Sequence, residues 1–227
     1  VFDQAKDKGA KGEAFDQLER QLFDASDKPQ DPPPEQLQLI IDVYTQGQLQ
    51  QVLSDVNQML ERFPNSAVLY NIAGAANVGL MRFDASIACF KQAIKINPNN
   101  AEAYNNMGNA LRAMGDLDAA IDSFKQALKI KPNNAQVYNN MGVALNDKGD
   151  PESAIDCYKK ALTIKPDYSE AYNNMGIALN DKGDPESAID CYKKALTIKP
   201  DYAVAYRHFS DLNSYKEHDE HFIKMQS

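Results

Sequence analysis

The sequence predicts an all-α fold, a right-handed α-solenoid built from stacked antiparallel helical hairpins. The stretch from Tyr138 to Tyr168 recurs as Tyr172 to Tyr202, at an offset of 34 residues and with Val143 replaced by Ile177 as the one change. Each copy carries two apolar stripes at helical spacing, which predict two amphipathic helices. A glycine separates the stripes and a proline follows the second, as expected where helices end. A fixed period of this length is typical of a repeat array.

The repeat frame divides most of the chain into five units. They are residues 33–66, 67–100, 101–134, 135–168 and 169–202. Residues 1–32 are interpreted as a partial repeat or capping helix followed by a proline-rich joint. Residues 203–227 are interpreted as a C-terminal partial repeat or capping helix, because the ends of a solenoid are usually atypical.

The unit at 101–134 illustrates how each hairpin is predicted. Its first stripe is followed by Gly115, and Asp116 is a suitable cap for the second helix. In mid-helix, Gly108 predicts a close approach of the second helix, with Ala120 opposite it and Phe124 filling the space one turn later. In the last two units, Asp150 and Asp184 are predicted N-caps, and each precedes a proline at the first helical position. In the second unit, Asn77 replaces an apolar residue and predicts a less packed first helix.

Composition and charge limit the possible partners. The chain has 227 residues, of which 43% are hydrophobic and 25% charged, with a net charge of -8. An acidic surface without a basic cluster repels phosphate backbones, so we expect no nucleic-acid partner. No apolar run of membrane-spanning length and no signal-peptide pattern occur, so we expect no membrane insertion and favour a cytoplasmic location. Because the chain begins at Val1, we also expect it to be a fragment, so the missing export signal carries little weight.

No constellation of residues predicts catalysis, a metal or a cofactor. Cys89, Cys157 and Cys191 form no disulfide framework and are expected to be packing residues. His218 and His221 are three residues apart and could share a helical face, but zinc needs three or four ligands. A solvated helix end is therefore the preferred interpretation. His208 replaces an asparagine of the earlier repeats and is expected to lie on the surface.

Asparagines recur at the start of the first helices, although asparagine is a poor helix former. Two hypotheses explain them: one amide of each pair bonds to the next repeat and was copied by duplication, or the amides form a ligand-binding ladder along a concave groove. The predicted ladder consists of Asn71, Asn105, Asn106, Asn109, Asn139, Asn140, Asn146, Asn173, Asn174 and Asn180. An amide both donates and accepts hydrogen bonds, so such a ladder suits an extended peptide backbone.

The repeat resembles the tetratricopeptide repeat family. The resemblance rests on Tyr104, the Met-Gly pair ending at Gly108, Ala120, Phe124 and Pro132, and on their counterparts in later units. It implies first helices that line a concave groove. The repeats also resemble those of O-linked N-acetylglucosamine transferases and of bacterial proteins whose repeats precede a sulfotransferase-like domain. The segment 206–227 is similar to the linker before that domain.

These observations and the resemblance lead to two functional hypotheses. The first is a scaffold without catalysis that binds a protein or an extended peptide. The second is the recognition arm of a larger sulfotransferase-like or glycosyltransferase-like enzyme. Asp147 and Asp181 lie at the predicted groove edge, so a neutral or basic ligand segment is expected. Self-association through an imperfectly capped end is a further expectation.

Overall fold

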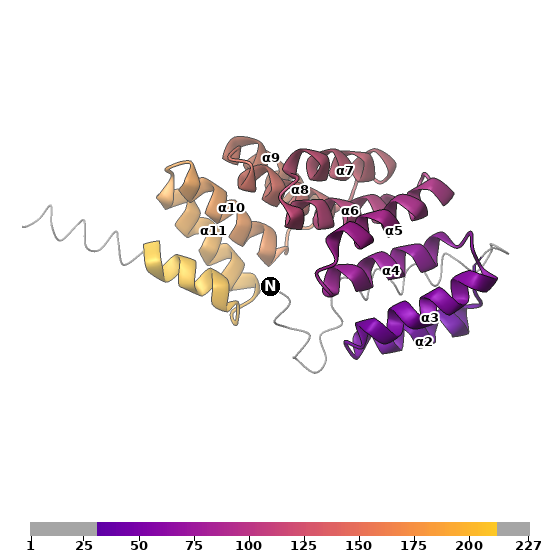
Figure 1. Cartoon of the computed structure of the whole chain (residues 1–227). Helices are drawn as coiled ribbons and strands as arrows, with labels where there is room; N and C mark the ends of the chain where they lie inside the picture. Colours follow the sequence, from indigo (N-terminus) through magenta and orange to yellow (C-terminus); the bar gives the residue numbers. More distant parts are fainter. Residues whose placement is uncertain (1–30, 213–227) are drawn as a thin grey trace, which may run out of the picture. The chain divides into compact units, whose positions relative to one another are not determined.

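The computed structural model describes residues 31–212, and every regular element in that range is an α-helix (Figure 1). The chain forms two compact units, Val1–Ile130 and Lys131–Ser227. The first contains α2 (Pro34–Thr45), α3 (Leu49–Arg62), α4 (Ala67–Gly79), α5 (Phe83–Ile96), α6 (Ala101–Met114) and α7 (Leu117–Ile130). The second contains α8 (Ala135–Asp147), α9 (Pro151–Ile164), α10 (Ser169–Asp181), α11 (Pro185–Ile198) and a helical stretch at 203–212.

Within each unit, consecutive helices pack against one another as hairpins. Each even-numbered helix is the first helix of a repeat and packs on the odd-numbered second helix that follows it. The second helix then packs on the first helix of the next repeat, and neighbouring first helices also touch, α4 with α6 and α8 with α10. This stacking confirms the predicted all-α fold class of helical hairpins. The right-handed twist of the solenoid stays a prediction.

The turn inside each hairpin is set by local backbone chemistry. Gly115 adopts the left-handed conformation with φ of 86° and ends α6, as the sequence predicts. Asp150 and Asp184 cap α9 and α11 by accepting hydrogen bonds from the backbone N–H groups of Ser153 and Ser187. Hydrogen bonds from the Ser153 side chain and backbone lower the pKa of Asp150. The cap therefore stays charged well below neutral pH, where it suits the positive end of the helix dipole.

The mid-helix glycines bring an aromatic ring against the backbone of the first helix. A Cβ added to Gly108 would lie 2.6 Å from Cε1 of Phe124, and one added to Gly142 would lie 2.6 Å from Cε1 of Tyr158. The three atoms nearest to that added Cβ of Gly108 all belong to the Phe124 ring, so Phe124 makes the closest approach, and the place of Ala120 opposite Gly108 stays a prediction. The predicted close approach of the two helices is confirmed.

The largest core of the first unit lies among α2, α3 and α4. Its buried residues are Leu37, Ile40, Ile41, Val52, Val56, Leu69, Ile72, Ala73 and Ala76. The expectation of a loosely packed α4 is wrong, because Asn77 is itself buried. Its side-chain amide donates to the Ala73 carbonyl oxygen at 2.9 Å, which satisfies the polar group inside the helix. No helix among residues 31–212 has the length and hydropathy needed to cross a membrane.

Met81 occupies the left-handed position that glycine holds in the other hairpin turns. Its φ is 59°, and its side chain is 76% exposed, so no packing compensates for the steric cost of its Cβ. We expect Met81→Gly to raise the free energy of unfolding by about 0.5–1 kcal/mol, after allowing for the greater freedom of glycine in the unfolded chain. Urea denaturation followed by circular dichroism measures the change. Met81→Ala keeps the Cβ and is the control, so an equal gain for both variants would contradict the argument.

Candidate binding face on the first helices

The predicted asparagines lie on the first helices but differ in exposure. The first member of each Asn-Asn pair, and the single Asn71, are buried: Asn71 is 0% exposed, Asn105 2%, Asn139 5% and Asn173 2%. The second members, Asn106, Asn140 and Asn174, are half-buried, as are Asn109 and Asn146, whereas Asn180 is exposed. Amides at adjacent positions of the helix therefore have different access to solvent.

Hydrogen bonds join the asparagine pairs from one repeat to the next. In the first unit, Asn105 Nδ2 donates to Asn106 Oδ1 at 3.3 Å, and Asn106 Nδ2 donates to Asn71 Oδ1 at 3.4 Å. In the second unit, Asn173 Nδ2 donates to Asn174 Oδ1 at 3.3 Å, and Asn174 Nδ2 donates to Asn139 Oδ1 at 3.1 Å. We call these hydrogen-bonded asparagines the amide chain. In it the second asparagine of a pair, Asn106 or Asn174, bonds to two buried amides.

The amide chain of the first unit ends at Asn71. The neighbouring position in α4 holds Ile72, which is 1% exposed, where later repeats have a second asparagine. The Nδ2 atom of Asn71 is consequently buried without a hydrogen-bond partner. An unsatisfied buried donor destabilises the fold by about 1–3 kcal/mol. The absence of a second asparagine therefore lowers the stability of this part of α4.

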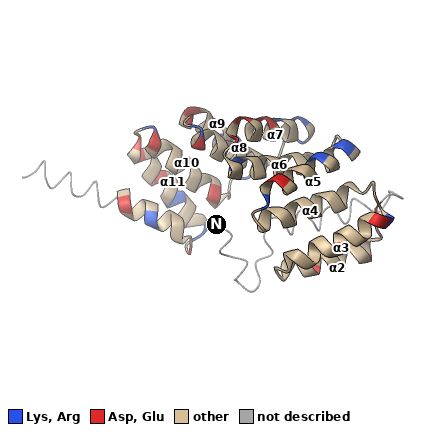
Figure 2. Ribbon diagram, viewed as in Figure 1, with Lys and Arg blue, Asp and Glu red and all other residues tan. Residues whose placement is uncertain are grey.

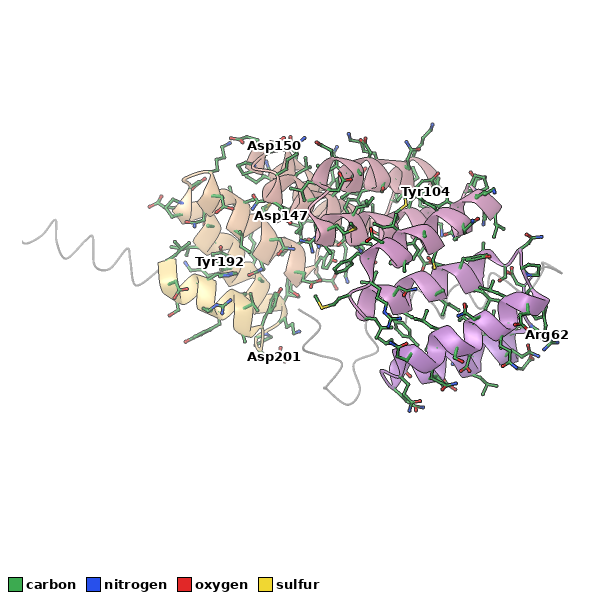
Figure 3. The ribbon with its side chains drawn as sticks, viewed as in Figure 1. Arg62, Tyr104, Asp147, Asp150, Tyr192 and Asp201 are labelled. Carbon is green, nitrogen blue, oxygen red and sulfur yellow. The ribbon has the colours of Figure 1, made fainter. Side chains whose placement is uncertain are left out.

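The amide chain of the second unit continues into the helical stretch 203–212. His208 Nδ1 lies 3.2 Å from Asn173 Oδ1, so this ring nitrogen donates to the amide oxygen. The His208 ring also contacts Tyr192 of α11, with ring centroids 5.5 Å apart. Tyr192 is labelled in Figure 3. The expectation that His208 is merely a surface residue is wrong. Its register, 34 residues after Asn174, is the signal that could have revealed the contact.

A second group of polar residues lies nearer the C-terminal ends of the first helices. Asn146 Nδ2 donates to Asp181 Oδ2 at 2.8 Å, which links α8 to α10. Within the described part of the chain, Asn109 and Asn180 make no side-chain hydrogen bond, and Asn180 is exposed. We call the surface formed by the polar side chains of the first helices within each unit the first-helix face. On it, these two amides keep donors and acceptors that no described residue uses.

Charge is distributed unevenly over the first helices. Helix α4 carries no charged residue (Figure 2). By contrast, α8 ends at Asp147 and α10 at Asp181, and both aspartates are exposed. In the second unit, Lys159 on α9 and Lys193 on α11 pair with acids one turn earlier. The second-unit portion of the first-helix face thus has exposed carboxylates at its C-terminal edge.

Tyrosines at the fourth position of each repeat belong to the hairpins. Tyr104, Tyr138 and Tyr172 are half-buried, and Tyr104 is seen in Figure 3. The ammonium groups of Lys160 and Lys194 lie 5.7 Å and 5.6 Å from the ring centroids of Tyr138 and Tyr172. These rings are thus occupied by lysines of their own second helices, which leaves them less suited to stacking on a ligand.

The cysteine thiols have pKa values unfavourable for reactivity. Burial raises the pKa of Cys157 and of Cys191 to about 11, and it also raises the pKa of Cys89. Only a small fraction of each thiol is then thiolate at pH 8, and that fraction rises tenfold per pH unit. We expect iodoacetamide to modify Cys157 and Cys191 about 100-fold more slowly in the native chain than in urea, as followed by mass spectrometry. Rapid native labelling at pH 8 would contradict this assignment.

Among residues 31–212 no group of three or more His, Cys, Asp or Glu side chains could hold a metal ion. The candidate ligands His218 and His221 lie outside the described residues, as do residues 1–30 of the predicted N-terminal segment and residues 213–227 of the predicted C-terminal one, whereas residues 203–212 form the helical stretch given above.

Comparisons with known proteins agree on the repeat. Family profiles described as TPR repeat match residues 82–115 and 108–149, and one described as tetratricopeptide repeat matches residues 133–201. Together they span residues 82–201, just over half of the chain. No curated protein sequence matches the chain.

Several solved structures are similar to the chain. The crystal structure of MamA is 26% identical with a TM-score of 0.64, and the match covers 72% of this chain and 96% of MamA. YrrB, described as a TPR protein with an unusual peptide-binding site, is 20% identical with a TM-score of 0.62, covering 82% of this chain and 96% of YrrB. A thermophilic TPR protein from Thermus thermophilus is 18% identical with a TM-score of 0.65, covering 78% of this chain and 97% of that protein. At these identities, the last two show the shared fold alone.

Proposed function

The chain belongs to the tetratricopeptide repeat family, and from this premise we propose that it is a scaffold that binds a protein or an extended peptide and has no catalytic activity of its own. The observation that carries the proposal is the row of amides on the first helices. It includes Asn109 and Asn180, whose side chains have no hydrogen-bond partner among residues 31–212. Free amides bind a peptide backbone through both its N–H and C=O groups. The YrrB structure supports the idea that this fold can carry a peptide-binding site.

The amides divide into two groups in this proposal. The first group stabilises the packing of the first helices beneath the ligand-facing surface. Its members are the buried Asn71, Asn105, Asn139 and Asn173. The half-buried and exposed members line the face that a ligand meets within each unit. They are Asn106 and Asn109 in the first unit, and Asn140, Asn146, Asn174 and Asn180 in the second. Each backbone hydrogen bond contributes about 0.5–1.5 kcal/mol, so affinity is modest and shared among repeats.

Charge defines the preferred ligand. Exposed Asp147 and Asp181 stand at the end of their first helices, and Asp181 is held in place by Asn146. A peptide with neutral or basic residues opposite this edge is favoured, whereas an acidic peptide is repelled. The attraction is exposed to solvent and therefore weakens as salt is added.

The test uses fluorescein-labelled peptides of neutral, basic and acidic composition, titrated with the chain and followed by anisotropy. Asn109→Ala and Asn180→Ala, made separately, are each expected to weaken the best peptide about threefold to tenfold without loss of helical content. Gln126→Ala, which removes an exposed amide from the second helix α7, is the matched control. Binding that is unaffected by both asparagine substitutions, or equally weakened by Gln126→Ala, overturns the assignment.

The second candidate function is the recognition arm of a larger enzyme of the sulfotransferase-like or glycosyltransferase-like kind. The resemblance of the repeats and of the segment 206–227 to such proteins supports it. The first-helix face would then bind the protein substrate while chemistry takes place on another domain. Sequencing the gene downstream of Ser227 separates the two candidates, since a long globular continuation favours the enzyme and an immediate stop favours the scaffold. Turnover by the isolated chain would overturn both.

A further inference from the structure

The C-terminal face of the fifth repeat is the surface of α10 and α11 that the stretch 203–212 covers. It duplicates the face with which the fourth repeat binds the fifth. Residues 144–168 and 178–202 are identical in sequence. The fourth repeat uses these side chains to bind the fifth. The fifth repeat therefore presents a second copy of an interface whose natural partner, a repeat of this sequence, is seen in the same structure.

The interface between the fourth and fifth repeats has three polar contacts and a buried alanine. Asn174 Nδ2 donates to Asn139 Oδ1 at 3.1 Å, and Asn146 Nδ2 donates to Asp181 Oδ2 at 2.8 Å. Lys182 Nζ lies 3.6 Å from Glu152 Oε1. Ala171, which is 0% exposed, packs with Ala161 and Tyr168. The incoming repeat thus supplies a small residue, an amide, a carboxylate and a lysine.

The stretch 203–212 carries the first two positions of this set, and the positions in register with Asp181 and Lys182 are Tyr215 and Lys216, which lie outside the described residues. Ala205 is 0% exposed and takes the place of Ala171, and His208 takes the place of Asn174. Asn180, the counterpart of Asn146, is exposed and has no partner among the described residues. Tyr206 is 63% exposed and Val204 41%, so part of the covering helix is itself poorly packed.

We propose that this C-terminal face is a docking site for a helical hairpin of the same repeat sequence supplied by another chain, and that the stretch 203–212 is a displaceable cap over it. The incoming first helix would place alanine where Ala205 lies and asparagine where His208 lies. Its aspartate, corresponding to Asp181, would accept a hydrogen bond from Asn180. The site lies at the end of the stack and shares Asn180 with the proposed peptide-binding face, whereas Asn109 on α6 belongs to that face alone.

Side-chain chemistry favours the incoming repeat over the cap. His208 donates to Asn173 only as the Nδ1–H tautomer when neutral. Burial and nearby Arg207 lower the pKa of His208, so the ring is neutral near pH 7. An asparagine donates in the same place without a tautomer requirement. Its side-chain oxygen also accepts a hydrogen bond from the asparagine that precedes it in the incoming helix, as Asn174 Oδ1 accepts from Asn173 Nδ2.

The test is a titration of a fluorescein-labelled peptide with the sequence of residues 169–202 against the full chain. Ala205→Arg places a long charged side chain at a fully buried position and expels the cap while leaving α10 and α11 unchanged. Because a cap that competes reduces the apparent affinity, this variant is expected to bind the peptide at least about tenfold more tightly than the parent chain. Val204→Arg, at an exposed position of the same helix, is the matched control and should bind like the parent.

Variants of the peptide test whether it binds the C-terminal face with the same contacts that the fifth repeat makes with the fourth. A peptide carrying Ala171→Arg should lose binding, and one carrying Asp181→Ala should bind about threefold or more weakly. A peptide carrying Lys193→Ala, changed on the exposed side of the second helix, should bind normally. The proposal is overturned if Ala205→Arg binds no more tightly than the parent, or if the Ala171→Arg peptide binds as well as the unmodified one. Neither outcome affects the Asn109 test of the first-helix face, because Asn109 lies on α6, outside this interface.

Discussion

Gly142→Leu is expected to lower the stability of the second unit by about 3 kcal/mol, because it forces a side chain into space held by an aromatic ring. The first added atom alone would lie 2.6 Å from Cε1 of Tyr158 and 2.9 Å from its Cζ. Tyr158 is 1% exposed and packs with Ala154, Ile155 and Ala178, so the ring has no free volume into which to move. Leucine is a better helix former than glycine by about 1 kcal/mol, which offsets only part of this cost.

Urea denaturation monitored by circular dichroism measures the loss, and amide hydrogen exchange locates it in α8 and α9. Repeat arrays can unfold in parts, so the local measurement is needed beside the global one. Lys159→Leu, at an exposed position of α9, is the matched control for added hydrophobicity. The double variant Gly142→Leu with Tyr158→Ala should be more stable than the sum of the single effects, because the smaller residue removes the clash. A stable Gly142→Leu variant would contradict the glycine–ring contact.

The hairpins were predictable because short-range chemistry determines them. The left-handed Gly115, the capping Asp150 and the proline after it each impose a local backbone conformation, whatever the tertiary environment. The identity of the residue opposite Gly108 was not predictable in the same way. It depends on how the two helices cross, and periodicity along one helix does not specify whether Phe124 or Ala120 approaches most closely.

The asparagines show a different limit of sequence reasoning. Duplication copies inter-repeat contacts and ligand contacts with equal fidelity, so the recurrence of Asn173 and Asn174 supports either hypothesis. Burial separates members of the set, since Asn173 is 2% exposed whereas Asn180 is exposed. The hydrogen bond of His208 could be anticipated from its register but not from its residue type, because a histidine at a solenoid end is also consistent with a solvated surface.

The amide chain makes Asn174 the asparagine of the second unit whose loss should cost most. Its side chain accepts from Asn173 at 3.3 Å and donates to Asn139 at 3.1 Å, and both partners are at least nine-tenths buried. Asn174→Ala leaves two buried polar groups without this partner, each at about 1–3 kcal/mol, so the expected loss of stability is about 2–6 kcal/mol. Asn180→Ala removes an exposed amide and should change stability by less than about 0.5 kcal/mol.

Urea denaturation of the two variants under identical conditions provides the comparison, and Asn174→Asp refines it. Aspartate at this position can still accept from Asn173 but cannot donate to Asn139, and it brings a negative charge toward a carbonyl oxygen. Its loss of stability at pH 7 should therefore equal or exceed that of alanine. This result bears on ligand binding too, because a combined Asn106, Asn140 and Asn174 to alanine variant would lose inter-repeat bonds together with ligand contacts. If Asn174→Ala proves as stable as Asn180→Ala, the amide chain contributes little to the stack, and the half-buried Asn174 is available to a bound peptide.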